Sequence, residues 1–173
     1  MTHSLFFLSV LLLLTLLHSP SDAATKLVDK VCKQTWNYSF CVESLYSDSR
    51  AGQADEYTLA FISVGLAYTN ATDTRDLISK LLINKGKSEP LETCFRDYKK
   101  AVSSLEVAYN DLNSETFFVI ANLTTQAARS ANHCETAFKG NEWRPLGNRN
   151  KDLMGLCEIC GIVAELFTGP APL

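Results

Sequence analysis

The sequence lacks the features that usually accompany nucleic-acid binding. It has no cluster of basic residues and no acidic tract, and its 16 lysines and arginines and 19 aspartates and glutamates give a formal net charge of −3. A nearly neutral chain of this kind is not expected to bind nucleic acid. No stretch alternates between apolar and polar residues as a half-buried strand would, so a sheet is not expected either.

Histidine is scarce, which limits the chemistry available. The chain has three histidines, and only His133 lies beyond residue 23. No Glu-x-x-His pair is present, which argues against a di-iron helical bundle, and no second histidine offers a metal set. Carboxylates are plentiful, but a thin bundle leaves little room for a substrate cleft. We expect no enzymatic activity, no metal and no cofactor.

The only long apolar run is at the start of the chain. It spans Leu5 to Leu17 and is followed by Ser21-Asp22-Ala23, the small-residue pattern that signal peptidase prefers. The run is shorter than the roughly 20 residues needed to cross a bilayer. The sequence therefore predicts a secretory signal peptide at residues 1–23, one extracellular domain at residues 24–173, and no membrane association.

The apolar residues that follow are spaced at three and four positions, which predicts helices. Four such stretches within residues 53–168 predict an all-α, antiparallel four-helix bundle, and residues 27–48 predict a short N-terminal helical hairpin folded about Trp36-Asn37. The first bundle helix has a polar stretch from Thr69 to Asp76; we favour one long helix over two. Ser88 is the expected cap of the second.

Four of the six cysteines can be paired from their positions, because disulfides are expected in a secreted chain. Cys94 and Cys134 each lie 20 residues from Ser114 at a predicted turn, so in an antiparallel hairpin both stand about 30 Å from that turn and can meet. Cys32 and Cys41 likewise flank the Trp36-Asn37 turn. A cysteine held in a disulfide is no nucleophile, so His133 gains no catalytic partner in its neighbour.

Cys157 and Cys160 form a Cys-x-x-Cys pair on the apolar face of the last predicted helix. We favour buried free thiols that pack as small hydrophobic groups. A third, local disulfide and a redox or metal role are the alternatives. N-glycan acceptor sequences at Asn37, Asn70 and Asn122 agree with secretion.

The chain resembles the plant invertase and pectin methylesterase inhibitor family from about Leu27 to Phe167. The residues that carry the resemblance are Val31-Cys32-Lys33-Gln34-Thr35 with Tyr38, Cys41, Val42, Leu45 and Asp48, then Leu91-Glu92-Thr93-Cys94 with Tyr98, Ala101 and Leu105, then Ala127-Ala128 with Cys134-Glu135-Thr136-Ala137-Phe138, and Pro145-Leu146 with Asn148. The resemblance implies the same hairpin, bundle and two disulfides. Cys157 and Cys160 lie outside the family pattern.

The resemblance further implies a protein that inhibits a carbohydrate-active enzyme of the cell wall or vacuole. Pectin methylesterase is the favoured target, bound one to one over its substrate cleft. Invertase is the alternative, although its inhibitors insert a Pro-Lys-Phe segment where this chain has Ser114 to Val119. A non-inhibitory pollen or structural protein of the same fold is a further alternative, and large core side chains argue against a small-ligand carrier.

Five residues near the predicted turn after the second bundle helix are candidate partner contacts: Asn113, Glu115, Thr116, Phe117 and Phe118. For the first three, simple helix capping is the competing and favoured interpretation. Phe117 and Phe118 are adjacent and cannot face the core equally, so one of them is a candidate exposed anchor, with packing in the core or hairpin as the favoured alternative.

Overall fold

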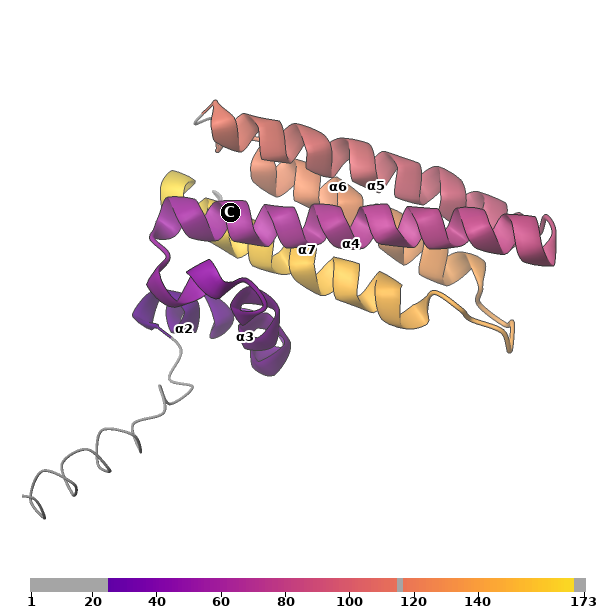
Figure 1. Ribbon diagram of the computed structural model, residues 1–173, viewed down its shortest axis with the longest axis horizontal. Helices are drawn as coiled ribbons and strands as arrows, with labels where there is room; N and C mark the ends of the chain where they lie inside the picture. Colours follow the sequence, from indigo (N-terminus) through magenta and orange to yellow (C-terminus); the bar gives the residue numbers. More distant parts are fainter. Residues whose placement is uncertain (1–24, 115–116, 170–173) are drawn as a thin grey trace, which may run out of the picture.

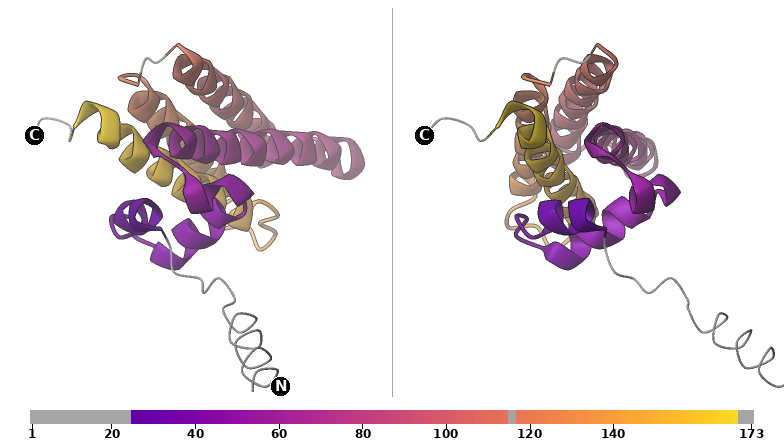
Figure 2. Two further views of the ribbon diagram at one scale, coloured as in Figure 1. Left: turned by 60° about the vertical axis from the view of Figure 1, so that its left-hand side comes forward. Right: turned by 90° about the vertical axis from the view of Figure 1, so that its left-hand side faces the viewer.

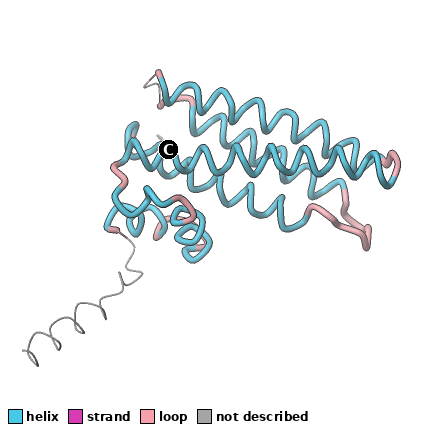
Figure 3. The backbone as a smooth tube through the Cα atoms, in the orientation of Figure 1, coloured by secondary structure: helices cyan, strands magenta, loops and turns pink. Residues whose placement is uncertain are grey.

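The computed structural model describes residues 25–114 and 117–169. These residues form helices and contain no strand, as expected (Figure 1, Figure 3). In chain order the elements are α2 (Lys26–Cys32), α3 (Tyr38–Tyr46), the 3-10 helix η1 (Ser49–Gln53), α4 (Glu56–Lys85), α5 (Glu89–Asn113), α6 (Ile120–Ala137) and α7 (Gly147–Thr168). In the part of the chain so described, no helix is both long enough and apolar enough to cross a membrane.

Helices α4 to α7 form the antiparallel bundle that the spacing predicts. α4 packs against α5 and α7, and α6 packs against the same two helices, so the four close into a ring around one core (Figure 2). The core combines large side chains with alanines on facing helices, which allow the backbones to approach closely. Its buried residues include Leu59, Ile62, Ala67, Ala71, Ile78, Tyr98, Ala101, Leu105, Ala108, Ala127, Ala131, Leu153 and Ile159.

Helix α4 continues through the polar stretch without a break, so the expectation of one long helix is correct. Ala71, Thr74 and Ile78 are buried at three- and four-residue steps, which keeps one face of the stretch in the core. The Thr74 hydroxyl donates to the Asn70 carbonyl at 2.7 Å, so its polar group is satisfied within the helix.

Side chains cap the N-terminal ends of α2, α3 and α4, whereas α5, α6 and α7 have no side-chain cap. Asp55 caps α4 by accepting a hydrogen bond from the Thr58 amide, and α4 stops at Gly86, which has a φ of 82°. Ser88 stands at the N-cap position of α5, but the expected side-chain hydrogen bond is absent. A cap side chain accepts from the amide of the second or third helical residue; Pro90, the second, has no amide hydrogen, so only the Leu91 amide is left as a donor.

Two disulfides close the two hairpins. Cys32 is bonded to Cys41, with Cα atoms 5.4 Å apart, and Cys94 is bonded to Cys134, with Cα atoms 4.5 Å apart. All four cysteines are fully buried. These are the two pairs that the turn positions indicate.

The N-terminal hairpin, α2 and α3, lies against the side of the bundle and contacts α7. Val28, Val31 and Leu45 are fully buried there. Gly155 of α7 leaves room for the Phe40 ring: a Cβ atom at this glycine would stand 2.6 Å from Cε1 of Phe40. The hairpin is therefore seated on a site shaped for it, which a helix pair this short needs in order to be stable.

Candidate partner-binding surface

The turn between α5 and α6 holds the candidate contacts named from the sequence. Asn113 is the last residue of α5, and its side-chain amide donates to the Tyr109 carbonyl at 3.3 Å. Asn113 thus bonds a carbonyl in the last turn of its own helix, which fits the capping interpretation. Glu115 and Thr116 lie outside the described residues.

Phe117 and Phe118 have opposite environments. The Phe117 ring stacks on Phe167 of α7, with centroids 3.9 Å apart and planes 4° from parallel. The Phe118 side chain is 82% exposed, and Val119 beside it is 44% exposed. Phe117 fixes the turn to the bundle, while Phe118 projects into solvent at the tip. The sequence limits the core to one of the two rings but does not say which, because that depends on where α7 ends.

An aromatic cluster packs against this turn on the side that faces the bundle. Tyr57 of α4 packs edge-on against Phe117 and Phe61, with centroid distances of 6.0 and 5.0 Å. The Tyr57 hydroxyl donates to the Leu112 carbonyl of α5 at 2.9 Å. Tyr57 of α4 and Phe167 of α7 therefore hold Phe117 against the bundle, which anchors the backbone next to the exposed Phe118 before a partner binds.

A groove of about 720 Å³ lies between α5 and α6. The residues that line it are Arg96, Lys99, Lys100, Ser103, Ser104, Gln126, Arg129 and Ser130. The sequence alone does not reveal this surface. The spacing along α5 shows that five of the residues share one face, but the α6 residues join them only once the two helices are placed side by side.

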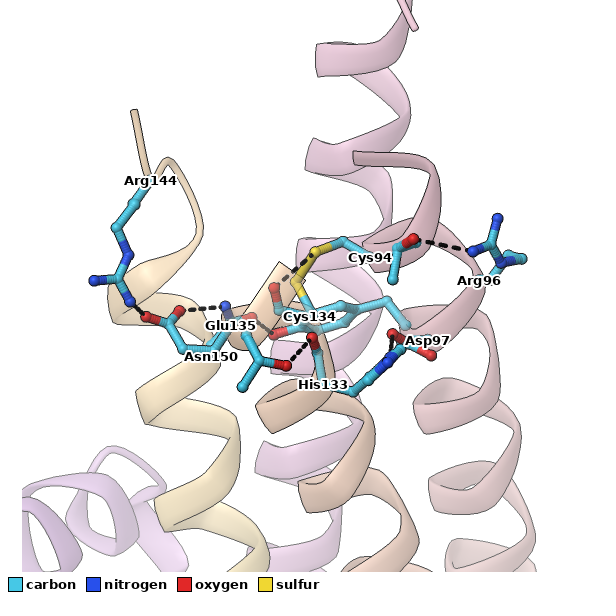
Figure 4. Close-up of a disulfide and its surroundings, with 11 residues drawn as sticks. Cys94, Arg96, Asp97, His133, Cys134, Glu135, Arg144 and Asn150 are labelled. Atoms are coloured by element: carbon cyan, nitrogen blue, oxygen red, sulfur yellow. Dashed lines mark hydrogen bonds and ion pairs between the residues drawn. A yellow bond between two sulfur atoms is a disulfide. The ribbon is translucent and has the colours of Figure 1, made fainter. Parts of the chain in front are cut away.

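An acidic residue and a histidine meet near the end of α5–α6 that holds the disulfide. The buried carboxylate of Asp97 lies 2.6 Å from Nδ1 of His133, whose side chain is 65% exposed. Figure 4 shows the two groups facing each other from neighbouring helices, close to the bond between Cys94 and Cys134. The contact between His133 and Asp97 therefore links α5 to α6 beside the disulfide.

A second polar network ties α5, α6 and α7 together. The buried Tyr98 hydroxyl donates to Oδ1 of Asn150 at 2.8 Å, and the Asn150 amide donates to Glu135 at 2.7 Å. Glu135 also pairs with Arg144 (Figure 4). Burial raises the pKa of the Tyr98 hydroxyl, so it stays a neutral donor. Tyr98 and Asn150 each satisfy the other's buried polar group.

Cys157 and Cys160 are buried free thiols. Burial raises the pKa of the Cys160 thiol to about 12 and that of Cys157 well above its usual value. Thiolates are the reactive form of cysteine, so both groups are poor nucleophiles and poor metal ligands. Among the residues described, no group of three or more histidines, cysteines and acids is placed to hold a metal ion.

The three glycan acceptor sites differ in accessibility. Asn122 is exposed on α6. Asn37 is half-buried and caps α3 by accepting from the Phe40 amide at 3.2 Å. Asn70 lies within α4, and its amide oxygen is buried without a hydrogen-bond partner. Asn122 thus offers the most open attachment point.

The sequence and fold match known proteins over most of the chain. The family model for plant invertase/pectin methylesterase inhibitors matches residues 26–161. The chain belongs to this family. The family consists of inhibitor proteins rather than enzymes. The prediction that this chain is not an enzyme is thereby confirmed.

The curated relatives of this chain are named as inhibitors of two different enzymes. A cell wall / vacuolar inhibitor of fructosidase 2 from Arabidopsis thaliana is 33% identical, covering 96% of this chain and 97% of its own. A pectinesterase inhibitor from Actinidia deliciosa is 29% identical, with 96% and 95% covered. The relatives therefore support the inhibitor class and divide over the enzyme inhibited.

Solved structures of the family share the fold. A mutant form of a pectin methylesterase inhibitor from Arabidopsis superposes with a TM-score of 0.73 at 21% identity, covering 82% of this chain and 97% of its own. A second Arabidopsis pectin methylesterase inhibitor gives a TM-score of 0.62 at 19% identity, with 86% and 99% covered. These likenesses establish the hairpin and bundle, and say nothing of the target.

Proposed function

We propose that this chain is a secreted inhibitor of pectin methylesterase that binds the enzyme one to one and covers its substrate cleft. The inhibitor class follows from the family, and the mechanism is steric. A rigid bundle needs an interface of roughly 1,200–2,000 Å² with an apolar anchor near its centre to bind stably. No chemistry by the inhibitor is required.

The exposure of Phe118 is the observation on which the proposal rests. It is a large, strongly exposed aromatic ring at the tip of a turn that Phe117 fixes to the bundle. Aromatic rings of this kind are over-represented among the residues that dominate binding energy. An inhibitor that covers a cleft needs an apolar anchor of this kind, carried by a segment that the bundle holds in place.

Pectin methylesterase is favoured over invertase because of the residues at the same turn. In the family, invertase inhibitors place Pro-Lys-Phe in this region, whereas the described residues here read Phe117-Phe118-Val119. The relative from Actinidia deliciosa is named as a pectinesterase inhibitor. Invertase stays the second candidate because the 33% identical relative is named for fructosidase inhibition.

Paired inhibition assays separate these targets. The purified chain is incubated with a plant pectin methylesterase and, separately, with a plant acid invertase, at the mildly acidic pH of the cell wall. Slowing of the esterase alone supports the proposal, and slowing of invertase alone moves the function to the second candidate. If neither enzyme slows, the chain is a non-inhibitory protein of the same fold.

A matched pair of variants tests the anchor. Phe118→Ala is expected to raise the inhibition constant by about 30-fold or more, the loss typical of an interface hot spot. Ile83→Ala is the control, because Ile83 is 78% exposed and lies at the opposite end of the bundle, near the end of α4. Equal inhibition by both variants would remove Phe118 from the interface.

The location of the protein follows the same proposal. The relative from Arabidopsis thaliana is named as a cell wall / vacuolar inhibitor. We place this chain in the cell wall, with the vacuole as the alternative, after removal of residues 1–23, which lie outside the described residues. The domain would then span residues 24–173, with glycans at accessible acceptor sites.

A further inference from the structure

The groove between α5 and α6 concentrates positive charge in a chain whose net charge is negative. Its α5 wall is built from positions 96, 99, 100, 103 and 104, a helical stripe two turns long, and its α6 wall from positions 126, 129 and 130. The cations are Arg96, Lys99, Lys100 and Arg129, and no acidic residue lines the groove.

These cations are available to a ligand. Among the described residues, Lys99 and Arg129 form no ion pair, and Arg96 bonds only the neutral hydroxyl of Thr93, at 3.0 Å. Lys100 lies 3.8 Å from Asp97, whose carboxylate is already held at 2.6 Å by His133. The groove therefore presents positive charge that the protein does not itself neutralise.

The remaining lining residues are polar and uncharged. Ser103, Ser104 and Ser130 supply hydroxyls, and Gln126 supplies an amide. No aromatic or aliphatic residue is part of the described lining, whereas the exposed apolar anchor, Phe118, lies in the turn between α5 and α6. A protein partner is usually bound through buried apolar anchors. Cations interleaved with hydroxyl and amide groups suit an extended, polar, anionic chain instead.

We propose that the α5–α6 groove binds a run of uronate carboxylates in de-esterified pectin. The choice of this polymer rests on the proposed function, because hydrolysis of a pectin methyl ester by water yields methanol and a carboxylate on the polymer. Guanidinium groups at Arg96 and Arg129 pair with carboxylates in a two-bond geometry. The groove thereby distinguishes the product of the esterase from its neutral substrate, and holds the inhibitor where the enzyme has acted.

Binding to defined oligosaccharides tests the proposal without any enzyme present. The probe is an unesterified oligogalacturonate, compared by calorimetry with the same oligosaccharide fully methyl-esterified, at a pH of about 6, where uronate carboxylates are ionised. N-glycans are removed first, since Asn122 is one helical turn from Gln126. We expect saturable binding of the unesterified form, weakening as salt is added, and no binding of the ester.

Variants locate the site. Arg96→Gln and Arg129→Gln are each expected to weaken binding by about two- to fivefold, the range of an exposed ion pair, and replacing all four groove cations by glutamine should abolish it. The control carries four glutamines at exposed lysines outside the groove lining, which keeps the net charge equal: Lys30, Lys80, Lys85 and Lys139. The control should keep the affinity of the unchanged protein.

Three results would overturn the assignment: no binding of the unesterified form, equal binding of the ester, or an equal loss in both four-site variants. If the protein binds no oligogalacturonate and the groove variant fails to inhibit the esterase, the groove is a contact for an acidic protein surface instead. Oligogalacturonate binding without inhibition of the esterase would keep the groove assignment and refute the proposed function.

Discussion

Replacing Asn150 by leucine should destabilise the bundle far more than an exposed substitution would. Asn150 is fully buried on α7 and accepts the Tyr98 hydroxyl at 2.8 Å. Leucine has a similar size but no acceptor, so the Tyr98 hydroxyl loses this partner in the core. A buried polar group left unsatisfied costs about 1–3 kcal/mol. The melting temperature should fall by about 2–12 °C, given about 2–4 °C per kcal/mol in a domain of this size.

Thermal and urea unfolding, both with the disulfides intact, measure this effect. Asn148→Leu is the control, since Asn148 is exposed near the start of the same helix and should change stability by less than about 0.5 kcal/mol. The urea midpoint should fall without a change in slope, because the surface exposed on unfolding stays the same.

A double-mutant cycle tests whether Tyr98 and Asn150 satisfy each other's polar groups. Tyr98→Phe alone removes the donor to Oδ1 of Asn150, whose amide still donates to Glu135, and Asn150→Leu alone removes the acceptor of the Tyr98 hydroxyl. The double variant contains neither of the two bonded atoms, so it should cost less than the sum of the two single changes by about 1 kcal/mol or more. Additive losses, within about 0.5 kcal/mol, would refute the claim that the two groups satisfy each other.

Three further predictions concern other parts of the molecule. Gly155→Ala should cost about 1–3 kcal/mol by forcing its methyl group into the phenylalanine ring of α3, whereas Gly161→Ala, which meets nothing within 4 Å, should stabilise α7 by up to about 1 kcal/mol. Reversed signs in urea unfolding would contradict the packing of the hairpin. Because burial raises the pKa of the Cys160 thiol to about 12, iodoacetamide at a pH of about 8 should label the free thiols only after unfolding. The unfolded thiol ionises near pH 8.5, so the associated stability is complete below about that pH and is lost as the pH rises toward the folded value; rapid labelling of native protein would disprove the burial. Glycopeptide mass spectrometry should find Asn122 occupied and Asn70 bare, and a glycan on Asn70 would contradict its packing.

The fold could be predicted because its signals are local. The three- and four-residue spacing marks α4 to α7, and the two disulfides follow from the positions of turns between helices of regular rise. The continuity of α4 through a polar stretch was also predictable, since Ala71 and Ile78 keep the apolar face in register.

The details of the surface depend on contacts between distant segments. Phe118 is exposed because Phe117 takes the place beside Phe167, and nothing within the turn itself decides between them. Ser88 does not form a side-chain cap, and Pro90 removes one of the two amides that could donate to it, a signal that the sequence does contain. The positive groove needs Arg129 beside α5, which only the packing of α6 provides.

A stoichiometric titration of a plant pectin methylesterase with this protein tests the proposed inhibition most directly. Methanol release from highly esterified pectin is followed at a fixed enzyme concentration far above the inhibition constant. Activity is expected to fall linearly and to reach its minimum at one inhibitor per enzyme. Excess pectin should slow the onset, because pectin and inhibitor compete for one cleft. An activity that stays constant at several equivalents of inhibitor would contradict one-to-one inhibition.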